Sequence, residues 1–451
     1  MSPNGSNGGE DLAGLSERLR VDIDARLVAS VGELEANGPA LSRADQRALA
    51  ASLTRCWLSE LVGERMAGGL SPLDRSQEEG LARQVLDALF GAAVLQPYLD
   101  DPTVREIRVN GPDVGFIVRT DGSKEPLPRL VRTNGELIGL IQSLAQHGSV
   151  AAGGERRFDA AHPILDMQLE SGHRVWATMG VTPQACMVIR AHDFGDLSRL
   201  VELGARGMFP PPLEDLLEAC VAARFNEIIA GATGTGKTTL LRANCNAIPT
   251  GERIVVIEDS PELGLDLLSD LHPDHVPMCK REDNIEGVGG ISMADLVRSA
   301  LRGSPDRVVV GETRGHETIP LLLAMSQGND GSMSTVHARS SGDVWFRLAT
   351  YAAMAPEGLS FEASAALIAG AVDLVIFLSP RPVNAPGGSP GVITSIRELT
   401  GCDQAGRVTS NEVLTWRAGR LVVGAGFRPE TAERLAAVGY DPARLEEVER
   451  W

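Results

Sequence analysis

One stretch of the sequence decides the fold, and it consists of Gly231, Ala232, Thr233, Gly234, Thr235, Gly236, Lys237, Thr238 and Thr239. It matches the pattern G-x-x-x-x-G-K-[ST], follows a short apolar run at 227–230 and leads into a segment of helical composition at 238–248. A glycine-rich turn between a strand and a helix points backbone N–H groups and a helix N-terminus at one anion. The stretch therefore predicts a binding loop for a nucleoside triphosphate, in which Lys237 reaches the β- and γ-phosphates and Thr238 holds Mg²⁺.

The composition is that of a soluble globular protein with two or three domains, since 451 residues exceed one ordinary core. The 60 acidic and 42 basic residues give a net charge of −18, which argues against broad, charge-driven binding to nucleic acid. A local basic channel for nucleic acid stays open. The N-terminal residues lack the features of a signal peptide, and no apolar run approaches the ~18 residues that span a bilayer. We therefore expect a cytoplasmic protein without a transmembrane segment.

The first half of the chain predicts two small domains. Apolar residues recur at three- and four-residue steps near the N-terminus, and further helices are expected after Ser42 and after Ser76, the latter with Glu79 in a capping box. These helices predict a bundle at 1–92. Short alternating strands separated by turn-forming residues, together with one amphipathic helix, then predict an α+β domain at 93–193.

The second half of the chain predicts an α/β domain. Three glycines and a run of prolines between 194 and 212 are typical of a linker with some helix in it. From 213 to 451, apolar strands alternate with helical segments, which predicts a mostly parallel sheet with helices on both faces. Antiparallel strands and a final helix are expected to form a C-terminal appendage of this domain.

Two acidic residues follow strands of the predicted sheet, and a histidine ends a third strand. Glu258 ends the apolar run 253–258, Glu312 follows the run 307–311, and His337 ends the run 333–337. The carboxyl ends of parallel strands share one edge with the glycine loop, where ligands of open α/β sheets bind. We assign Glu258 to activation of the attacking water and Glu312 to the Mg²⁺ shell, through water. Spacing alone leaves His337 open as a packed or surface residue.

Five segments together resemble the ATPases of type II and type IV secretion systems, and within them the CpaF-like ATPases of Tad-type pili. The segments are 106–111, 231–239, 257–263, 306–315 and 328–337. The resemblance implies a RecA-like P-loop domain preceded by an α+β, PAS-like domain. It also implies that Glu258 is the catalytic carboxylate, Glu312 the Walker B glutamate and His337 the His-box histidine near the γ-phosphate. The segment 287–290, Thr313 and Asn329 depart from the family pattern, but none of these departures removes a catalytic group.

The same resemblance implies that arginines of the α+β domain close over the triphosphate. Arg157, Arg174 and Arg190 stand in the matching segments, and a planar, permanently charged guanidinium suits the equatorial oxygens of a phosphate. Taken from the sequence alone, each of these arginines is more often half of a surface ion pair.

The implied function is that of a hexameric ATPase at the inner face of the cell membrane. Such a motor hydrolyses ATP with Mg²⁺ and drives pilus assembly or protein secretion through an inner-membrane platform protein. Three alternatives stay open: a DNA-transfer motor of the same superfamily, a P-loop kinase of small molecules, and a nucleotide-binding scaffold without turnover. Stimulation by DNA would identify the first, and a phosphorylated acceptor the second.

Overall fold

The structure, a computed structural model, describes residues 12–35, 43–68, 71–90, 93–146, 157–169, 171–191, 199–281, 283, 288–381 and 388–450. The chain forms two compact units, Met1–Ala191 and His192–Trp451. In the described ranges, no helix is long and apolar enough to cross a bilayer.

The first unit begins with three helices, α1 (Leu12–Glu35), α2 (Arg43–Ala67) and α3 (Arg75–Phe90). Apolar residues at helical spacing on α1, among them Leu19 and Ile23, are buried against α2 and α3. The predicted start of α3 was wrong. Asp74, not Ser76, caps this helix, because its carboxylate accepts from Gln77 N at 2.8 Å while the Gln77 side chain accepts from Asp74 N at 3.0 Å.

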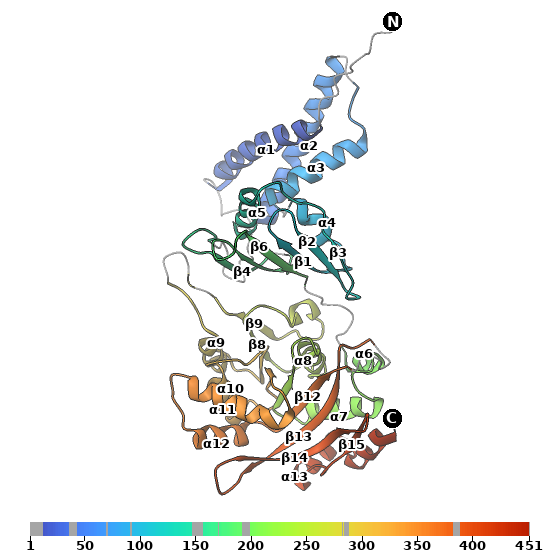
Figure 1. The fold of residues 1–451 in the computed structure, drawn as a ribbon, viewed down its shortest axis with the longest axis vertical. Helices are drawn as coiled ribbons and strands as arrows, with labels where there is room; N and C mark the ends of the chain where they lie inside the picture. The colour runs from blue at the N-terminus through green and yellow to red at the C-terminus, as the bar shows by residue number, and fades with distance from the viewer. Residues whose placement is uncertain are drawn as a thin grey trace. The chain divides into compact units, whose positions relative to one another are not determined.

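Six strands of the first unit form an antiparallel sheet in the order β3-β2-β1-β6-β5-β4 (Figure 1). They are β1 (Val104–Asn110), β2 (Gly115–Arg119), β3 (Lys124–Pro126), β4 (Ile164–Gln168), β5 (Arg174–Thr178) and β6 (Cys186–Arg190), preceded by η1 (Ala93–Leu95) and α4 (Gln96–Leu99). One face of the sheet packs on α5 (Asn134–Gln146), with Ile141 of the helix and Val175 of the sheet in one buried cluster. This face holds the core of the domain.

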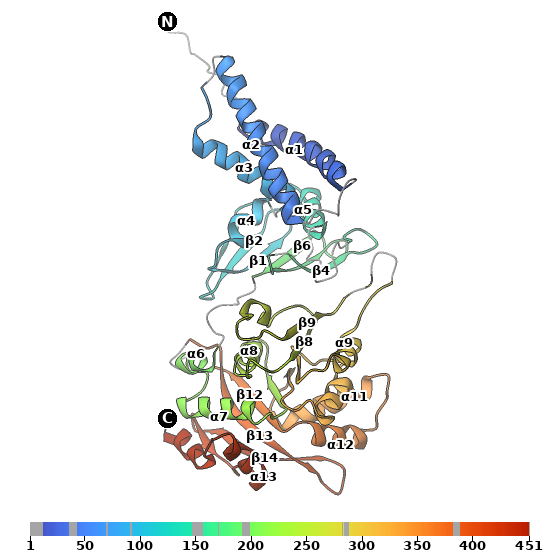
Figure 2. The same ribbon diagram turned by 180° about the vertical axis from the view of Figure 1, so that it is seen from behind.

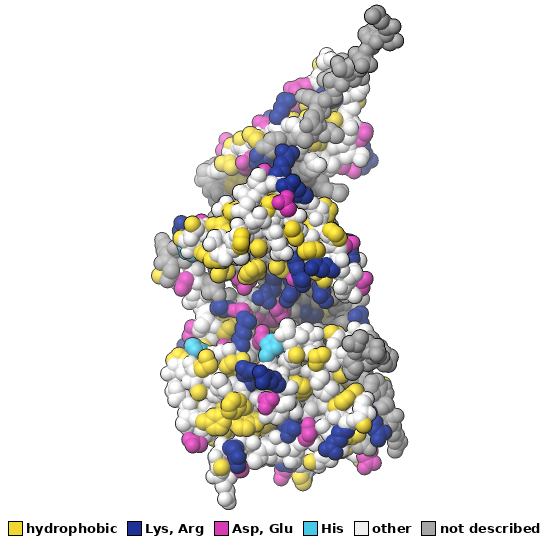
Figure 3. All heavy atoms as spheres, viewed as in Figure 1, with side chains coloured by type: hydrophobic (Ala, Val, Ile, Leu, Met, Phe, Trp, Pro, Cys, Tyr) yellow, Lys and Arg dark blue, Asp and Glu magenta, His cyan; other side chains and the backbone are white. Residues whose placement is uncertain are grey.

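The other face of the six-stranded sheet carries charge. Arg174, Arg190 and Glu106 lie directly opposite one another on β5, β6 and β1. Residues in such a row project from the same face of an antiparallel sheet. A group of Lys and Arg side chains is visible on the surface of this unit (Figure 3). We call the set Arg108, Arg174, Arg190 and Glu106 the charged row.

The second unit contains a nine-stranded sheet in the order β15-β14-β13-β12-β7-β11-β10-β8-β9. The strands are β7 (Glu227–Gly231), β8 (Ile254–Glu258), β9 (His275–Cys279), β10 (Arg307–Val310), β11 (Met333–His337), β12 (Leu374–Pro380), β13 (Gly391–Cys402), β14 (Val408–Arg417) and β15 (Arg420–Val423). From β12 to β9 all neighbours pair in parallel, whereas β13, β14 and β15 extend the sheet antiparallel. The carboxyl ends of β7, β8, β10 and β11 therefore share one edge.

Helices cover both faces of this sheet, as predicted, and confirm the α/β, RecA-like class (Figures 1 and 2). On one face lie α6 (Leu200–Ala205), α7 (Pro211–Ala222), α8 (Lys237–Asn246) and α13 (Pro429–Ala437). On the other face lie α9 (Met293–Ala300), α10 (Thr318–Ser326), α11 (Val344–Met354) and α12 (Phe361–Ala371). Short 3₁₀ segments are η3 (Leu265–Leu268), η4 (Leu301–Gly303), η5 (Ser341–Asp343) and η6 (Pro442–Arg450).

Part of the segment that the sequence predicted to be a linker belongs to the core of the second unit. Leu200, Leu203, Met208 and Phe209 are each at most 3% exposed and join the cluster beneath α7 and α8. The prolines at 210–212 open α7, where the first helical position tolerates a missing N–H. The glycines and prolines of this segment thus form the turn between α6 and α7, two helices that pack on the sheet.

Candidate functional site

The glycine-rich loop connects β7 to α8 in the predicted way. β7 is fully buried and ends at Gly231, and α8 begins at Lys237 directly after the loop. Gly234 and Gly236 have φ of 75° and 88°, in the left-handed region that side chains disfavour. The backbone at Gly236 therefore turns sharply into α8, and the N-terminus of that helix faces the loop.

Two glycines far apart in the sequence leave the room that this loop occupies. A Cβ on Gly231 would overlap the carbonyl oxygen of Leu378 at the end of β12, and a Cβ on Gly391 would overlap that of Thr235. Gly391 begins β13, so the loop is enclosed by the last parallel strand and its antiparallel neighbour. Gly391 was not among the predicted site residues, because no local motif links it to the loop.

Lys237 is held at the mouth of the loop. Its Nζ donates to Ala232 O at 3.0 Å and lies 3.4 Å from Nδ1 of His337. Burial lowers the pKa of Lys237, while the negative charges of Glu312 and Glu262 oppose this effect. The ammonium is thus partly desolvated and close to other groups that the sequence assigned to the site.

His337 and Glu312 come together at the ends of adjacent strands. β10 and β11 pair in parallel, with Val310 opposite Ser334, and Nε2 of His337 lies 2.9 Å from Oε1 of Glu312. Burial and the neighbouring Lys237 lower the pKa of His337, whereas Glu312 raises it. The imidazole therefore joins the lysine of the loop to the carboxylate that follows β10.

Glu258 is the most deeply buried of the three predicted strand-end residues, with 6% of its surface exposed. Its Oε1 accepts hydrogen bonds from the backbone N–H groups of Glu262, at 2.9 Å, and Leu263, at 3.0 Å. Burial raises the pKa of Glu258 to about 7 even though these N–H groups lower it. A Cβ on Gly311 would come 3.0 Å from Cγ of Glu258, so the glycine after β10 makes space for this carboxyl.

A second ion pair spans the same edge, and its residues were not among the predicted site residues. The guanidinium of Arg314 contacts Asp259 and lies 3.8 Å from Oε2 of Glu312. Nζ of Lys280, just beyond β9, lies 3.3 Å from Oδ1 of Asp259. The sequence did hint at this ion pair, because Asp259 and Arg314 lie within two residues of Glu258 and Glu312. A charged residue at the end of a strand is, however, more simply interpreted as exposed to solvent.

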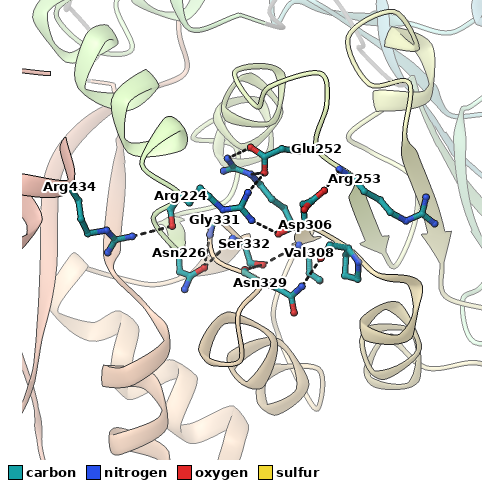
Figure 4. Close-up of polar contacts among 12 residues, drawn as sticks. Arg224, Asn226, Glu252, Arg253, Asp306, Val308, Asn329, Gly331, Ser332 and Arg434 are labelled. Atoms are coloured by element: carbon teal, nitrogen blue, oxygen red, sulfur yellow. Dashed lines mark hydrogen bonds and ion pairs between the residues drawn. The ribbon is translucent and has the colours of Figure 1, made fainter. Parts of the chain in front are cut away.

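Two of the three departures from the family pattern have structural explanations, and the third, at 287–290, begins outside the described residues. Thr313 is buried, and its hydroxyl is paired with that of Ser334 at 2.7 Å, so a polar group is accommodated there. Asn329 lies before β11, at the edge of the sheet away from the glycine loop, and its Nδ2 donates to Pro305 O at 2.7 Å (Figure 4). Of the predicted His-box segment, only its end at His337 reaches the loop edge.

The edge that holds Asn329 carries a network of hydrogen bonds and ion pairs (Figure 4). The side chain of Asn226 donates to Met325 O and Ala371 O and accepts from the N–H groups of Gly331 and Ser332, at 2.8 to 3.0 Å. This single amide joins the ends of α10 and α12 to the residues that precede β11.

The three predicted arginines lie in the first unit, in two places. Arg174 and Arg190 are cross-strand neighbours in the charged row. Arg157 lies on the segment before β4, where its guanidinium contacts Asp159. Their position relative to the glycine loop stays a prediction.

Comparison with known proteins identifies the family. Residues 90–414 match the family model described as "Type II/IV secretion system protein". The "Putative conjugal transfer protein" of Mycobacterium tuberculosis is 34% identical over 299 residues, which cover 64% of this chain and 81% of the relative. PtlH, a type IV secretion system protein of Bordetella pertussis, is 30% identical over 65% of this chain and 90% of its own length.

Among solved structures, the VirB11 ATPase of Brucella suis is 27% identical and covers 67% of this chain and 91% of its own, with a TM-score of 0.35. The match to the family model spans most of the chain, from before β1 into β14. The chain therefore belongs to the type II/IV secretion system protein family.

Proposed function

We propose that this protein is a ring-forming ATPase, with six copies in the ring, that hydrolyses ATP to ADP and phosphate. It uses the energy to assemble a Tad-like pilus or to secrete protein, through a platform protein in the inner membrane on whose cytoplasmic side it acts. The observation that carries the proposal is the meeting of Lys237, His337 and Glu312 at the edge that holds the glycine loop.

The residues at this edge fit a triphosphate with Mg²⁺. The glycines of the loop keep its backbone clear of side chains, and the ammonium of Lys237 suits the β- and γ-phosphates. Oxygen donors are what Mg²⁺ prefers, and Thr238, the half-buried second residue of α8, supplies a hydroxyl while Glu312 acts through water. The metal would neutralise charge that develops on the phosphates.

The strand-end carboxylates would then share the work of hydrolysis. Glu258 accepts the proton of the attacking water, and a pKa of about 7 suits a general base near neutral pH. Its two backbone hydrogen bonds fix the carboxyl in one orientation. His337 holds the side chains of Glu312 and Lys237 at a fixed distance from each other, so that the contacts to the metal and to the phosphates form together.

Arg174 and Arg190, with a lesser part for Arg157, would couple hydrolysis to movement. A nucleotide drives a conformational change only if it binds two arrangements with different affinity. Guanidinium groups that contact the γ-phosphate bind ATP and not ADP, and so provide that difference.

Phosphate release by the purified protein, with native mass measured in the presence of a non-hydrolysable ATP analogue, tests the proposal. We expect Lys237→Ala to abolish binding of the analogue and Glu258→Gln to keep binding but lose turnover. Full activity in either variant would overturn the assignments. A phosphorylated small molecule as product, instead of inorganic phosphate, would identify a kinase.

A second candidate is a motor that transfers DNA. It is favoured by the mycobacterial relative, whose name refers to conjugal transfer. The net charge of −18 counts against it. Stimulation of the ATPase by single- or double-stranded DNA at physiological salt would support this candidate, and its absence would leave protein or pilin as the cargo.

A further inference from the structure

The charged row contains a carboxylate that is unusually well covered for an outer-face residue. The Glu106 side chain is 7% exposed, and its two oxygens accept from Arg108, with Nε to Oε1 at 2.9 Å and Nη2 to Oε2 at 3.2 Å. Such a two-point arginine contact fixes the orientation of both groups. Arg108 is two residues along the same strand, so Glu106 needs no further cation to satisfy its lone pairs.

Arg190 approaches the same carboxylate more loosely. Its Nη2 lies 3.7 Å from Oε2 of Glu106, beyond hydrogen-bond distance, and its side chain is 65% exposed. Within the described ranges, no hydrogen bond donated by the Arg190 guanidinium is seen. Glu106 therefore attracts this guanidinium but leaves its N–H donors for another acceptor.

The position of Glu106 explains why it is needed. Arg174 and Arg190 lie directly opposite each other on β5 and β6, and like charges in that relation repel. Glu106 lies directly opposite Arg190 on the other side, and it is the one carboxylate at the paired positions Gln168, Arg174, Arg190, Glu106, Val118 and Lys124. The cation pair is thus balanced from one side by an anion built into β1.

Ionisation of Glu106 is consistent with that arrangement. Burial raises the pKa of Glu106, but the hydrogen bond from Arg108 and the charges of Arg190, Arg108 and Arg105 outweigh it, so the pKa is lowered. The carboxylate carries its charge at neutral pH and competes with any other anion for Arg190.

We propose that Glu106 is a positioning residue that holds Arg190 when no γ-phosphate is present and gives it up when one arrives. The inference rests on the proposed contact between Arg190 and the triphosphate. ATP then gains a contact with Arg190 at the expense of the Arg190–Glu106 ion pair, whereas ADP, which lacks the γ-phosphate, leaves the pair intact. Glu106 thereby weakens ATP binding selectively and returns Arg190 to its resting position after hydrolysis.

The test is the affinity of the full chain for a non-hydrolysable ATP analogue and for ADP, both with Mg²⁺, by calorimetric titration. Glu106→Gln keeps the shape of the side chain and an oxygen for Arg108 but removes the charge. We expect the variant to bind the ATP analogue about two- to fivefold more tightly, which corresponds to the energy of an exposed ion pair. Its affinity for ADP should change by less than about twofold.

A double-mutant cycle shows whether the effect passes through Arg190. In an Arg190→Ala background, Glu106→Gln should no longer tighten binding of the ATP analogue. The matched control is Glu125→Gln, which removes another arginine-paired carboxylate of the same sheet, on the core-facing side opposite Ile117. It should leave both affinities unchanged.

Equal tightening for both nucleotides, no tightening, or a gain that persists without Arg190 would overturn the inference. Arg190→Lys covers the case in which Glu106→Gln fails to fold, because Arg190 is exposed. Unchanged discrimination between the ATP analogue and ADP in that variant would also overturn it. If wild type binds the analogue and Lys237→Ala does not, the proposed function stands whatever Glu106 does.

Discussion

Nε2 of His337 lies 2.9 Å from Oε1 of Glu312, and this contact joins the ends of two neighbouring parallel strands. Because Nδ1 of the same imidazole lies 3.4 Å from Nζ of Lys237, one side chain spans the distance between the loop lysine and the carboxylate. The geometry makes His337 the group on which their relative position depends.

We therefore expect His337→Ala to lower kcat on the order of 100-fold, the effect of a small misplacement of reacting groups, with a smaller change in KM. Steady-state phosphate release measures both. His316→Ala is the control, since His316 is exposed on the segment after β10, and it should behave like wild type. A His337→Ala variant with unchanged kcat would show that the contact is only structural.

The activity should depend on pH through Glu258. Burial raises the pKa of this carboxyl to about 7, so its deprotonated fraction grows with pH through that value. We expect kcat/KM to rise with pH, to level off above about pH 8, and to report an apparent pKa near 7 for the free enzyme.

Glu258→Gln should abolish this rise and lower kcat by about 10²- to 10⁴-fold, the usual contribution of general base catalysis. Binding of an ATP analogue should be retained, which separates this loss from unfolding. A variant that keeps the wild-type pH profile would assign the rise to another group.

Stability should fall as pH rises, because of a second buried acid. Glu227, at the start of β7, is fully buried, and burial raises its pKa to about 8 against the opposing effects of Asn244 and Arg307. The folded chain therefore keeps a proton that the unfolded chain releases near pH 4.5, and stability decreases between these two values.

Glu227→Gln is neutral at every pH and removes this slope. Its amide can also donate to Oδ1 of Asn244, which has no partner among the described residues. We expect the variant to be more stable than wild type at pH 8 by at least about 1 kcal/mol, a rise of about 2–4 °C in Tm by calorimetry. Identical pH slopes in the two proteins would show that Glu227 is ionised in the fold.

Asn226 should be among the residues whose loss destabilises the second unit most. Asn226→Ala leaves two N–H groups and two carbonyls without their buried partner, at about 1–3 kcal/mol for each unsatisfied group. Urea unfolding should show a loss of at least about 3 kcal/mol. Asn226→Asp should also destabilise, because an oxygen would face Met325 O and Ala371 O; full stability of that variant would contradict the network.

The sequence predicted what depends on local pattern. The loop at Gly231–Thr239 and the edge shared by Glu258, Glu312 and His337 follow from a short motif and from the direction of parallel strands. β9 was missed because Pro277 interrupts its pattern, and only the edge position of this strand tolerates a residue without an N–H.

Contacts between distant segments could not be predicted. Gly391 and Leu378 enclose the loop through backbone atoms, which leave no side-chain signature. The burial of Met208 and Phe209 depends on where α7 packs, which the sequence does not show. The glycines and prolines around these two residues therefore favoured the prediction of a linker. The balance between Arg190 and Glu106 likewise depends on strand register, which the sequence alone left open.

A Cβ on Gly231 would overlap the carbonyl oxygen of Leu378 in β12, and a Cβ on Gly391 in β13 would overlap that of Thr235, so substitution at either glycine would force the loop and the neighbouring strand apart. The antiparallel part of the sheet therefore packs directly against the glycine-rich loop. A change in the shape of the loop during turnover would therefore move β13 together with β14 and β15, which pair with it in sequence. The C-terminal helices that pack against these strands would move with them.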